Sequence, residues 1–442
     1  MRKINFSPSE LIRFANIVPA VQSLQALKKG QDYLMKNKLV IVRQENKIVS
    51  AFFEEMNLVQ VSLNNFEDTG ILGNIYLGKV KNIVKNINAA FIEIEDGKMC
   101  YYPMAENRYP IMANEEESGE EKPGLTEVKV KAGDELLIQV VKEDIKTKAP
   151  VVSSNLNFTG KYVALTYGKS TIGVSSKITD EKERKRLKNI AMQYRSREYG
   201  FILRTNAANM PEEKIRAEME SLIAVYHSIR KYGVHKSRFS LVYETPPNYI
   251  CDIRDGYAEN VDEFITDDKV LYNHIREYLM QYQAEDLYKL KYYEDPLLHL
   301  ANLYGVHEKL EEALRSYVWL KSGGTLVIQP TEALTVIDVN TGKAVAGKKK
   351  VQETFLKVNR EAAKEIARQI RLRNLSGIII IDFIDLESAK DQELLMEELA
   401  EYLKMDPIKT ILVDMTALGL VEVTRKKVRK PLHEQVAEFH IT

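Results

Sequence analysis

Two strand-like segments in the last third of the chain each end in an aspartate, and one amphipathic segment lies between them. The first, residues 334–340, carries Asp338 and Asn340, and the second, residues 377–383, carries Asp382. Ligands of open α/β sheets gather outside the carboxyl ends of the strands, so a βαβ unit would bring these three side chains to one rim. The pattern predicts an α/β sheet with an acidic site at that rim.

The segment between the two aspartates is predicted to be a helix. Over about residues 351–373 its apolar side chains recur at spacings of three, four and seven, which is the period of one helix face. The following run Ile378–Ile381 is continuously apolar, as is typical of a strand buried on both faces. An aspartate at the end of such a strand is costly unless it has a partner.

The acidic residues and Asn340 offer the oxygen ligands that Mg²⁺ prefers, usually one or two carboxylates with waters and substrate phosphates. Asp338 and Asp382 would hold the ion and leave positions open for a phosphodiester and its attacking water. One isolated strand-end aspartate is more often a turn cap or an acceptor of backbone N–H groups. Two of them flanking one helix favour a catalytic metal site.

The overall composition describes a globular protein with balanced charge. Its 442 residues allow about three domains, and its 63 basic and 63 acidic residues cancel. Only local clusters can then favour a polyanion, and basic residues gather at 425–430 and 348–350, acidic ones at 115–121. Each run can equally be a solvated surface.

Cysteine content and hydropathy indicate the compartment. Cys100 and Cys251 lack the spacing of a zinc site or a disulfide framework, which favours a reducing environment. No apolar run approaches the roughly 20 residues that span a bilayer. We therefore expect a cytoplasmic protein.

The remaining chain divides into segments of different character. Residues 37–63 predict a β-hairpin at the edge of a sheet, and short strands over 71–149 indicate a small barrel with an acidic loop. Residues 150–244 mix strands with helices, and a long helical pattern dominates 262–320. The further predicted helices lie at residues 1–36, 180–193 and 211–232.

Two groups of residues outside the acidic pair suggest contact with RNA. Phe91 and Tyr101 can be core residues of the barrel, or they can form a stacking platform for single-stranded RNA, together with Lys148. Arg204 and Thr205 follow an apolar strand and are either surface residues or a clamp for a terminal phosphate.

The chain resembles the bacterial ribonuclease E/G endoribonucleases over about residues 37–430. The most specific stretches are Pro330–Gly342, Arg360–Arg373, Gly377–Leu386 and Leu418–Lys427. The resemblance implies a multidomain α/β and α+β fold. An RNase H-like subdomain (37–70 and 245–315) is interrupted by an S1-type OB-fold barrel (71–149) and a 5′-sensor subdomain (150–244). A DNase I-like catalytic subdomain (316–430) follows, with an N-terminal extension (1–36) and a tail (431–442).

The same resemblance implies roles for individual residues. The metal ligands fall on Asp338 and Asp382, with Asn340 beside the metal. The implied RNA contacts are Phe91, Tyr101, Lys148 and Arg373. The implied 5′-phosphate pocket is formed by Gly160, Arg204 and Thr205, where the glycine permits close backbone approach.

The chain also departs from better-known members of that family. No cysteine motif follows Lys430, so the expected homodimer would have no zinc link. Residues Ile145, Ser176 and Ala417 stand where those members carry arginine, and Ile71 and Leu72 stand where lysines are expected. The grip on RNA would therefore be weaker or differently placed.

Together these patterns predict a Mg²⁺-dependent endoribonuclease of RNA processing and decay, acting on single-stranded mRNA and rRNA precursors. In-line attack by a metal-activated water would leave 5′-phosphate and 3′-hydroxyl ends, with 5′-monophosphorylated RNA preferred. The main rival is a non-catalytic RNA-binding protein that uses the barrel platform. A protein-interaction scaffold, based on the acidic loop and the N-terminal helix, is the third hypothesis.

Overall fold

The computed structural model describes residues 36–66, 70–113, 125, 127–143, 149–255, 261–342 and 351–439. Predictions for residues 1–35, the acidic loop at 114–124, Lys148 and the lysines at 348–350 lie outside these described ranges. The described residues form two compact units, one within Met1–Phe66 and Asn260–Thr442 and the other within Glu67–Glu259.

The first sheet of the former unit contains the predicted hairpin. Its strand order is β15-β14-β1-β2-β3, and Glu45, with a φ of 55°, lies in the hairpin turn. The strands are β1 (Lys38–Gln44), β2 (Lys47–Glu54), β3 (Asn57–Asn65), β14 (Glu263–Thr266) and β15 (Leu290–Tyr292). The hairpin of β1 and β2 is confirmed, but its expected place at the sheet edge is wrong, because the distant strand β14 pairs with β1 in parallel and β3 pairs with β2.

The region predicted to be mainly helical, residues 262–320, is only partly so. Its helices are α5 (Lys269–Tyr282), α6 (Leu300–Leu303) and α7 (Val306–Leu314). Strands β14, β15 and β16 (Tyr317–Trp319) also lie there, and each has only three or four residues. Such short strands carry too little periodic signal to be read from the sequence.

The second sheet of this unit contains the predicted βαβ segment. Its strand order is β16-β17-β18-β19-β21-β20. The further strands are β17 (Thr325–Pro330), β18 (Leu334–Asn340), β19 (Gly377–Asp382), β20 (Thr410–Met415) and β21 (Leu420–Arg425). Strands β18 and β19 are parallel, and α8 (Val351–Leu372) lies between them in the sequence, as predicted.

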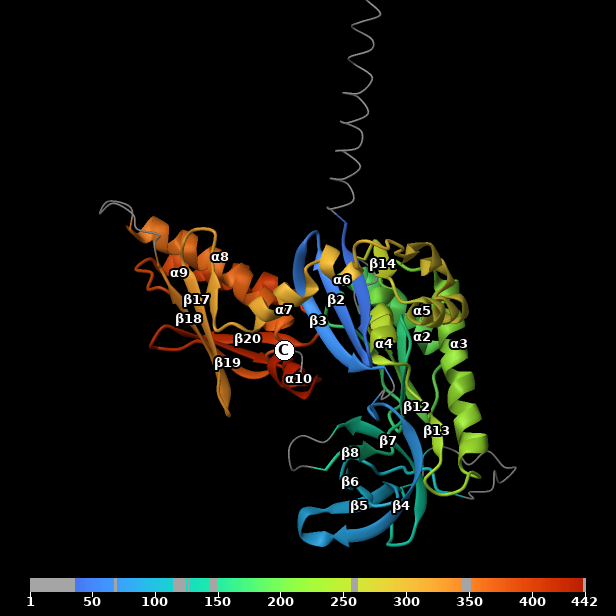
Figure 1. Cartoon of the computed structure of the whole chain (residues 1–442). Helices are drawn as coiled ribbons and strands as arrows, with labels where there is room; N and C mark the ends of the chain where they lie inside the picture. Colours follow the sequence, from blue (N-terminus) through green and yellow to red (C-terminus); the bar gives the residue numbers. More distant parts are fainter. Residues whose placement is uncertain are drawn as a thin grey trace, which may run out of the picture. The chain divides into compact units, whose positions relative to one another are not determined.

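Helices α8 and α9 (Ala389–Lys404) cover one face of this second sheet (Figure 1). Ala363 and Ile366 of α8 and Leu399 of α9 pack in one core with Ile337 and Ile381 of the strands. The remaining helix of the unit, α10 (Leu432–Phe439), contacts β3 of the first sheet.

The opposite face of the second sheet is exposed, which corrects one prediction. The apolar run of β19 was expected to be buried on both faces, yet only Ile379 and Ile381 are buried, while Ile378 is 50% exposed. Side chains alternate along a strand, so Ile378 and Ile380 lie on the face away from the helices. We call this surface the open face; it carries Tyr317, Trp319, Val327, Asp338, Asn340, Ile378, Ile380 and Asp382.

The second unit contains the predicted barrel. Its sheet has the order β13-β4-β5-β6-β8-β7, and an additional pairing of β4 with β7 closes five of these strands into a barrel. The strands are β4 (Ile75–Val84), β5 (Ala89–Glu95), β6 (Lys98–Pro103), β7 (Glu135–Lys142), β8 (Val151–Ser153) and β13 (Leu241–Tyr243). Gly78 leaves room for Ile92 and Ile138 inside, because a Cβ there would collide with both side chains.

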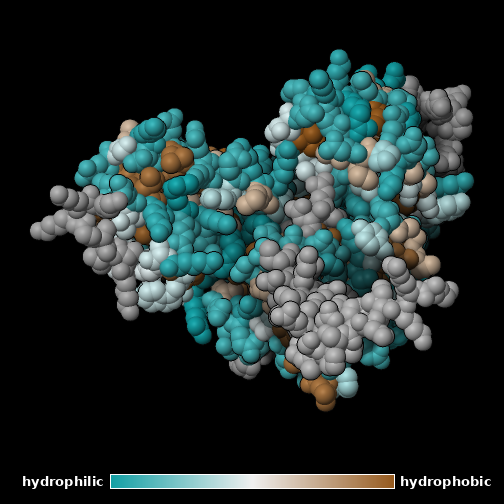
Figure 2. Space-filling view, turned by 90° about the horizontal axis from the view of Figure 1, so that it is seen from above, coloured by the Kyte–Doolittle hydropathy of each residue, from teal (hydrophilic) through white to brown (hydrophobic). Residues whose placement is uncertain are grey.

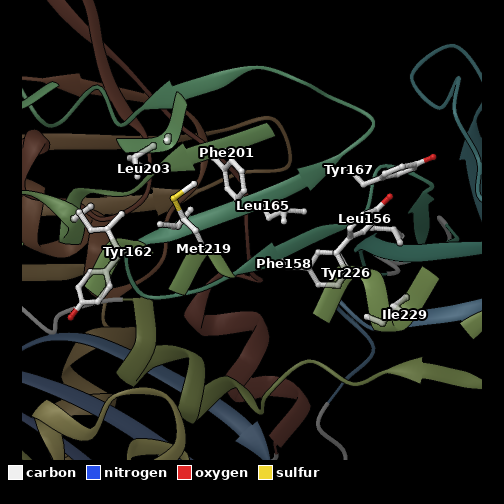
Figure 3. Close-up of a cluster of buried hydrophobic side chains, with 14 of the residues drawn as sticks. Leu156, Phe158, Tyr162, Leu165, Tyr167, Phe201, Leu203, Met219, Tyr226 and Ile229 are labelled. Atoms are coloured by element: carbon white, nitrogen blue, oxygen red, sulfur yellow. The ribbon is translucent and has the colours of Figure 1, made fainter. Parts of the chain in front are cut away.

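A second sheet in this unit has the order β11-β12-β10-β9. Its strands are β9 (Asn157–Thr159), β10 (Val163–Tyr167), β11 (Ile172–Val174) and β12 (Tyr199–Leu203). The helices of the same unit are α2 (Glu181–Met192), α3 (Glu212–Ser228) and α4 (Asn248–Asp255). Figure 3 shows Leu165 and Phe201 of the strands in one buried cluster with Met219 and Tyr226 of α3. The helices predicted near 180–193 and 211–232 are confirmed as α2 and α3.

The face drawn in Figure 2 is mostly hydrophilic, with small separate hydrophobic patches. Among the described residues, no helix is both long and apolar enough to cross a membrane.

Candidate active site and RNA-contact sites

Asp338 and Asp382 lie directly opposite each other on neighbouring strands. The parallel register of β18 and β19 pairs Asp338 with Asp382, just as it pairs Ile337 with Ile381. Because Ile337 and Ile381 point into the helix-covered core, both carboxylates point to the open face. The sequence prediction that the two acids converge is therefore supported by their position, 44 residues apart in the chain and one strand apart in space.

Asn340 joins this pair through a hydrogen bond. Its Nδ2 donates to Asp338 Oδ2 over 2.6 Å, and Asn340 lies on the open face because it is two residues beyond Asp338. The bond orients the Asp338 carboxylate. Among the described residues no ion pair involves Asp338 or Asp382, so the two acids face each other without a basic partner.

This arrangement raises the pKa of one of the acids. Partial desolvation, followed by the negative charges of Asp338 and Asp385, raises the pKa of the Asp382 carboxyl above its usual value. A cation between the carboxylates would remove that repulsion. Two carboxylates and the amide oxygen of Asn340 fit a hard divalent ion that keeps part of its water shell.

The two aromatic residues of the predicted stacking platform are neighbours on the barrel. Phe91 of β5 pairs with Tyr101 of β6, and their rings meet edge to face with centroids 6.1 Å apart. Both are half-buried, whereas Tyr102, the next residue of β6, points inward and is fully buried. Phe91 and Tyr101 are therefore on the outer surface of the barrel, where a base can reach them.

The three residues of the implied 5′-phosphate pocket also lie close together. Arg204 and Thr205 follow β12, and Gly160 follows β9. Arg204 Nη1 donates to the Gly160 carbonyl over 2.5 Å and to Asp255 Oδ1 over 2.9 Å. The Thr205 hydroxyl lies 3.1 Å from that of Ser175, which follows β11. In the sequence, only the family resemblance links these three residues. Their proximity in the structure supports one shared site.

The sequence did not reveal the acidic partners of this pocket. Glu218 of α3 accepts hydrogen bonds of 2.7 Å from the backbone N–H groups of Lys161, Tyr162 and Val163. Burial raises the pKa of Glu218, although these donors and Arg204 favour its ionised form. A Cβ on Gly160 would collide with the Glu218 carboxylate, so the glycine is needed for close approach of this side chain.

Asp255 is the second partner that sequence patterns missed. Burial opposes its ionisation, but the neighbouring guanidinium groups of Arg254 and Arg204 hold the pKa of Asp255 below its usual range. Asp255 therefore competes, as a charged group, for the guanidinium that was expected to bind a phosphate.

Two arginines that looked available in the sequence are buried. Arg373 is only 7% exposed and donates through Nε to Gln369, so its role as an RNA contact remains a prediction that its placement does not favour. Arg425, part of the basic run 425–430, is 3% exposed and forms a buried ion pair with Asp406. The prediction of that run as a uniformly exposed basic cluster is wrong at Arg425.

A basic groove outside the predicted sites lies between β11 and α2. It has a volume of about 670 Å³, and Ile172, Gly173 and Val174 line one side. Lys182, Lys185 and Lys188 of α2 line the other, are exposed, and form no ion pair with any described residue. Their spacing of three along a charged helix was the one signal in the sequence.

Comparison with known sequences identifies the relatives of this chain. The profile described as "Ribonuclease E/G family" matches residues 157–428. Ribonuclease G of Escherichia coli K12 is 33% identical over 387 residues, covering 86% of this chain and 78% of the relative. Ribonuclease G of Haemophilus influenzae is 33% identical over 399 residues (89% and 80%), and ribonuclease E of Nostoc sp. 32% over 404 residues (90% and 57%).

A closed barrel, a mixed α/β scaffold and these matches define the protein as an endoribonuclease. The chain belongs to the ribonuclease E/G family, which confirms the resemblance drawn from its sequence. The non-catalytic RNA-binding and scaffold hypotheses are thereby set aside.

Proposed function

We propose that this endoribonuclease cleaves single-stranded RNA with Mg²⁺ bound at Asp338 and Asp382, leaving 5′-phosphate and 3′-hydroxyl ends. The observation that carries the proposal is the pairing of the two carboxylates on one exposed sheet face, without a basic partner among the described residues. Such a pair is unfavourable unless it binds a cation.

The residues around the pair have separate tasks. Asp338 and Asp382 supply the charged oxygens, and Asn340 holds Asp338 in position through its 2.6 Å hydrogen bond. A bound Mg²⁺ would supply Lewis-acid polarisation of the phosphate and a water of lowered pKa. The open face admits a phosphodiester because Asp382 is exposed there.

The barrel would bind part of the RNA substrate and take no part in the cleavage step. Phe91 and Tyr101 offer two outward-facing rings, and base stacking on such rings contributes about 1–3 kcal/mol per base. Lys148, which is outside the described residues, is proposed as a phosphate contact on the strength of the family resemblance alone. Arg373 is proposed as an RNA contact only because the family resemblance suggests it.

Gly160, Arg204 and Thr205 are proposed to sense a 5′-monophosphate. Arg204 presents a planar fork of donors that matches phosphate oxygens, and Thr205 adds a hydroxyl beside it. A bound 5′ end would then order the RNA and raise the rate of cleavage. We further propose roles in mRNA decay and rRNA processing, and assembly into a homodimer.

The decisive experiment compares wild type with Asp338→Asn on a short A/U-rich RNA, with Mg²⁺ or with a chelator. Since metal stabilisation of the transition state is worth several kcal/mol, the variant should lose at least about a hundredfold in kcat/KM. Asp385→Asn, which removes a nearby acid outside the paired strands, is the matched control and should retain most activity.

Cleavage that persists in the chelator, or an Asp338→Asn variant as active as Asp385→Asn, would contradict the metal site. Sequencing the product ends checks the chemistry, because 2′,3′-cyclic phosphates would show that the 2′-hydroxyl is the nucleophile.

A further inference from the structure

The chain contains a single tryptophan, and it is one of the most exposed large side chains of the described structure. Trp319 of β16 is 68% exposed, and its neighbour on the same face, Tyr317, is 63% exposed. Val318 between them packs against the core under α8 and α9. An exposed tryptophan forgoes the large free energy that burial of its ring would give, so its position needs an explanation.

The register of the sheet places both aromatic residues beside the acidic pair. Tyr317 pairs with Val327, Val327 with Asp338, and Asp338 with Asp382, so all four belong to one row of the open face. Trp319 pairs with Thr325, which pairs with Asn340. At about 4.8 Å between neighbouring strands, the Trp319 backbone lies about 10 Å from that of Asn340.

The charge of the open face decides which ligand fits it. A second protein chain that covered the aromatic rings would also bury Asp338 and Asp382 without a basic partner, which is costly. A nucleic acid that brings its cation to the acidic pair meets no such penalty, and its bases offer flat apolar surfaces for Trp319 and Tyr317.

Resting on the proposed function, we propose that Trp319, flanked by Tyr317, is a base-stacking subsite of the catalytic sheet. It binds an unpaired nucleobase about one or two nucleotides from the scissile phosphate and positions that phosphate over Asp338 and Asp382. This subsite is separate from the Phe91 and Tyr101 platform, which is on the barrel of the other unit.

Because Trp319 is the sole tryptophan, its fluorescence reports on this position alone. In the full-length Asp338→Asn variant with Mg²⁺ present, which keeps the cation but should not cut the RNA, titration with a short single-stranded A/U-rich RNA should quench the emission to a saturating level. The same RNA with abasic nucleotides throughout should bind without this quenching. Unchanged emission with saturating RNA would overturn the proposal.

Cleavage with a series of RNAs, each with one abasic nucleotide, tests the positioning role. With Mg²⁺, one abasic position near the cut should lower wild-type kcat/KM about tenfold, and Trp319→Ala should lower it similarly on intact RNA. The two changes should not add, since both remove the same stack. Trp319→Phe should restore most activity, and Tyr288→Ala, which removes a 71% exposed ring elsewhere, should change little.

The outcomes separate this proposal from the proposed chemistry. Quenching by RNA without any Mg²⁺-dependent cleavage would leave the stacking subsite standing and reject the metal mechanism. Efficient cleavage with independent, additive effects of Trp319→Ala and every abasic position would reject the subsite alone. Emission that changes with protein concentration in the absence of RNA would show that a second copy covers the open face, and would also overturn the proposal.

Discussion

The two candidate sites, one in each unit of the chain, differ in how their charged side chains are partnered. On the open face of one unit, Asp338 and Asp382 stand together, and no described basic side chain pairs with them. In the other unit, Arg204 is paired with Asp255, and three backbone N–H groups bind Glu218. The proposed metal site therefore has no internal counter-charge among the described residues, whereas a phosphate at the proposed 5′-end site would share the Arg204 guanidinium with Asp255.

The largest expected effect tests whether removing one member of a buried ion pair destabilises the protein, whichever unit contains the pair. Arg425 and Asp406 form a pair with side chains only 1% and 2% exposed, in the same unit as the acidic pair. Arg425→Met removes the guanidinium that neutralises the buried Asp406 carboxylate, so the free energy of unfolding should fall by about 3–5 kcal/mol in urea denaturation. Lys427→Met, an exposed neighbour, should stay within about 0.5 kcal/mol. Equal losses for both would contradict the buried role of Arg425.

The next effect concerns the proposed 5′-phosphate site, where Arg204 is paired with Asp255. Arg204→Met should bring the cleavage rates of 5′-monophosphorylated and 5′-hydroxyl RNA to the same value, removing about a tenfold preference. Asp255→Asn should do the reverse and strengthen the preference several-fold, because it frees the guanidinium that Asp255 now holds at 2.9 Å. The measurement is the ratio of kcat/KM for the two RNAs. A lower ratio in Asp255→Asn would show that Asp255 assists the phosphate rather than competing with it.

A smaller effect concerns how the stability of the protein depends on pH through the acidic pair. The pKa of Asp382 is raised in the folded protein, so this group favours folding at low pH, and that contribution is lost as the pH rises through the folded pKa. With a chelator present, Asp382→Asn should therefore be as stable as wild type near pH 4 and more stable at pH 7. Because Asp382 is exposed, we expect a gain below about 1 kcal/mol.

Thermal denaturation across this pH range, with and without Mg²⁺, measures the effect. Added Mg²⁺ should stabilise wild type and leave Asp382→Asn almost unchanged. A variant that is less stable than wild type at pH 7 in the chelator would show that the acidic pair is not under repulsion.

The smallest effect concerns the basic groove of the other unit. Replacing Lys182, Lys185 and Lys188 by glutamine should weaken RNA binding in low salt and reduce the slope of log affinity against log salt by about 2. Arg186→Gln on the same helix is the control, since its guanidinium is already paired with Glu183. An unchanged slope in the triple variant would show that the three lysines are a solvated surface.

Local sequence patterns were sufficient for much of the scaffold. The βαβ segment was predicted with strands at 334–340 and 377–383, and the structure gives β18 as Leu334–Asn340 and β19 as Gly377–Asp382. Helix α2 begins after Asp180, whose side chain accepts from the Lys182 N–H, as its capping chemistry suggests. These features depend on neighbours within one or two turns of chain, so their signals are present in the sequence itself.

Other features depend on partners that are far away in the chain. Arg425 stands in a run of basic residues, and only packing against Asp406 and Asn374 makes it a core residue. The apolar run of β19 cannot tell whether one or both of its faces will be covered, and Ile378 proved to be exposed. The short strand β14 depends on pairing with the distant strand β1, and β15 depends in turn on pairing with β14.

The site shows the same division. The two aspartates at strand ends, the arginine after β12 and the aromatic pair of the barrel could be named from residue type and spacing, because chemistry and periodicity are local properties. Their register across β18 and β19, the open face that exposes them together with Trp319, and the internal partners Asp255 and Glu218 emerged only on folding. Strand pairing and burial are set by the summed packing of distant segments, and no short stretch of chain contains that information.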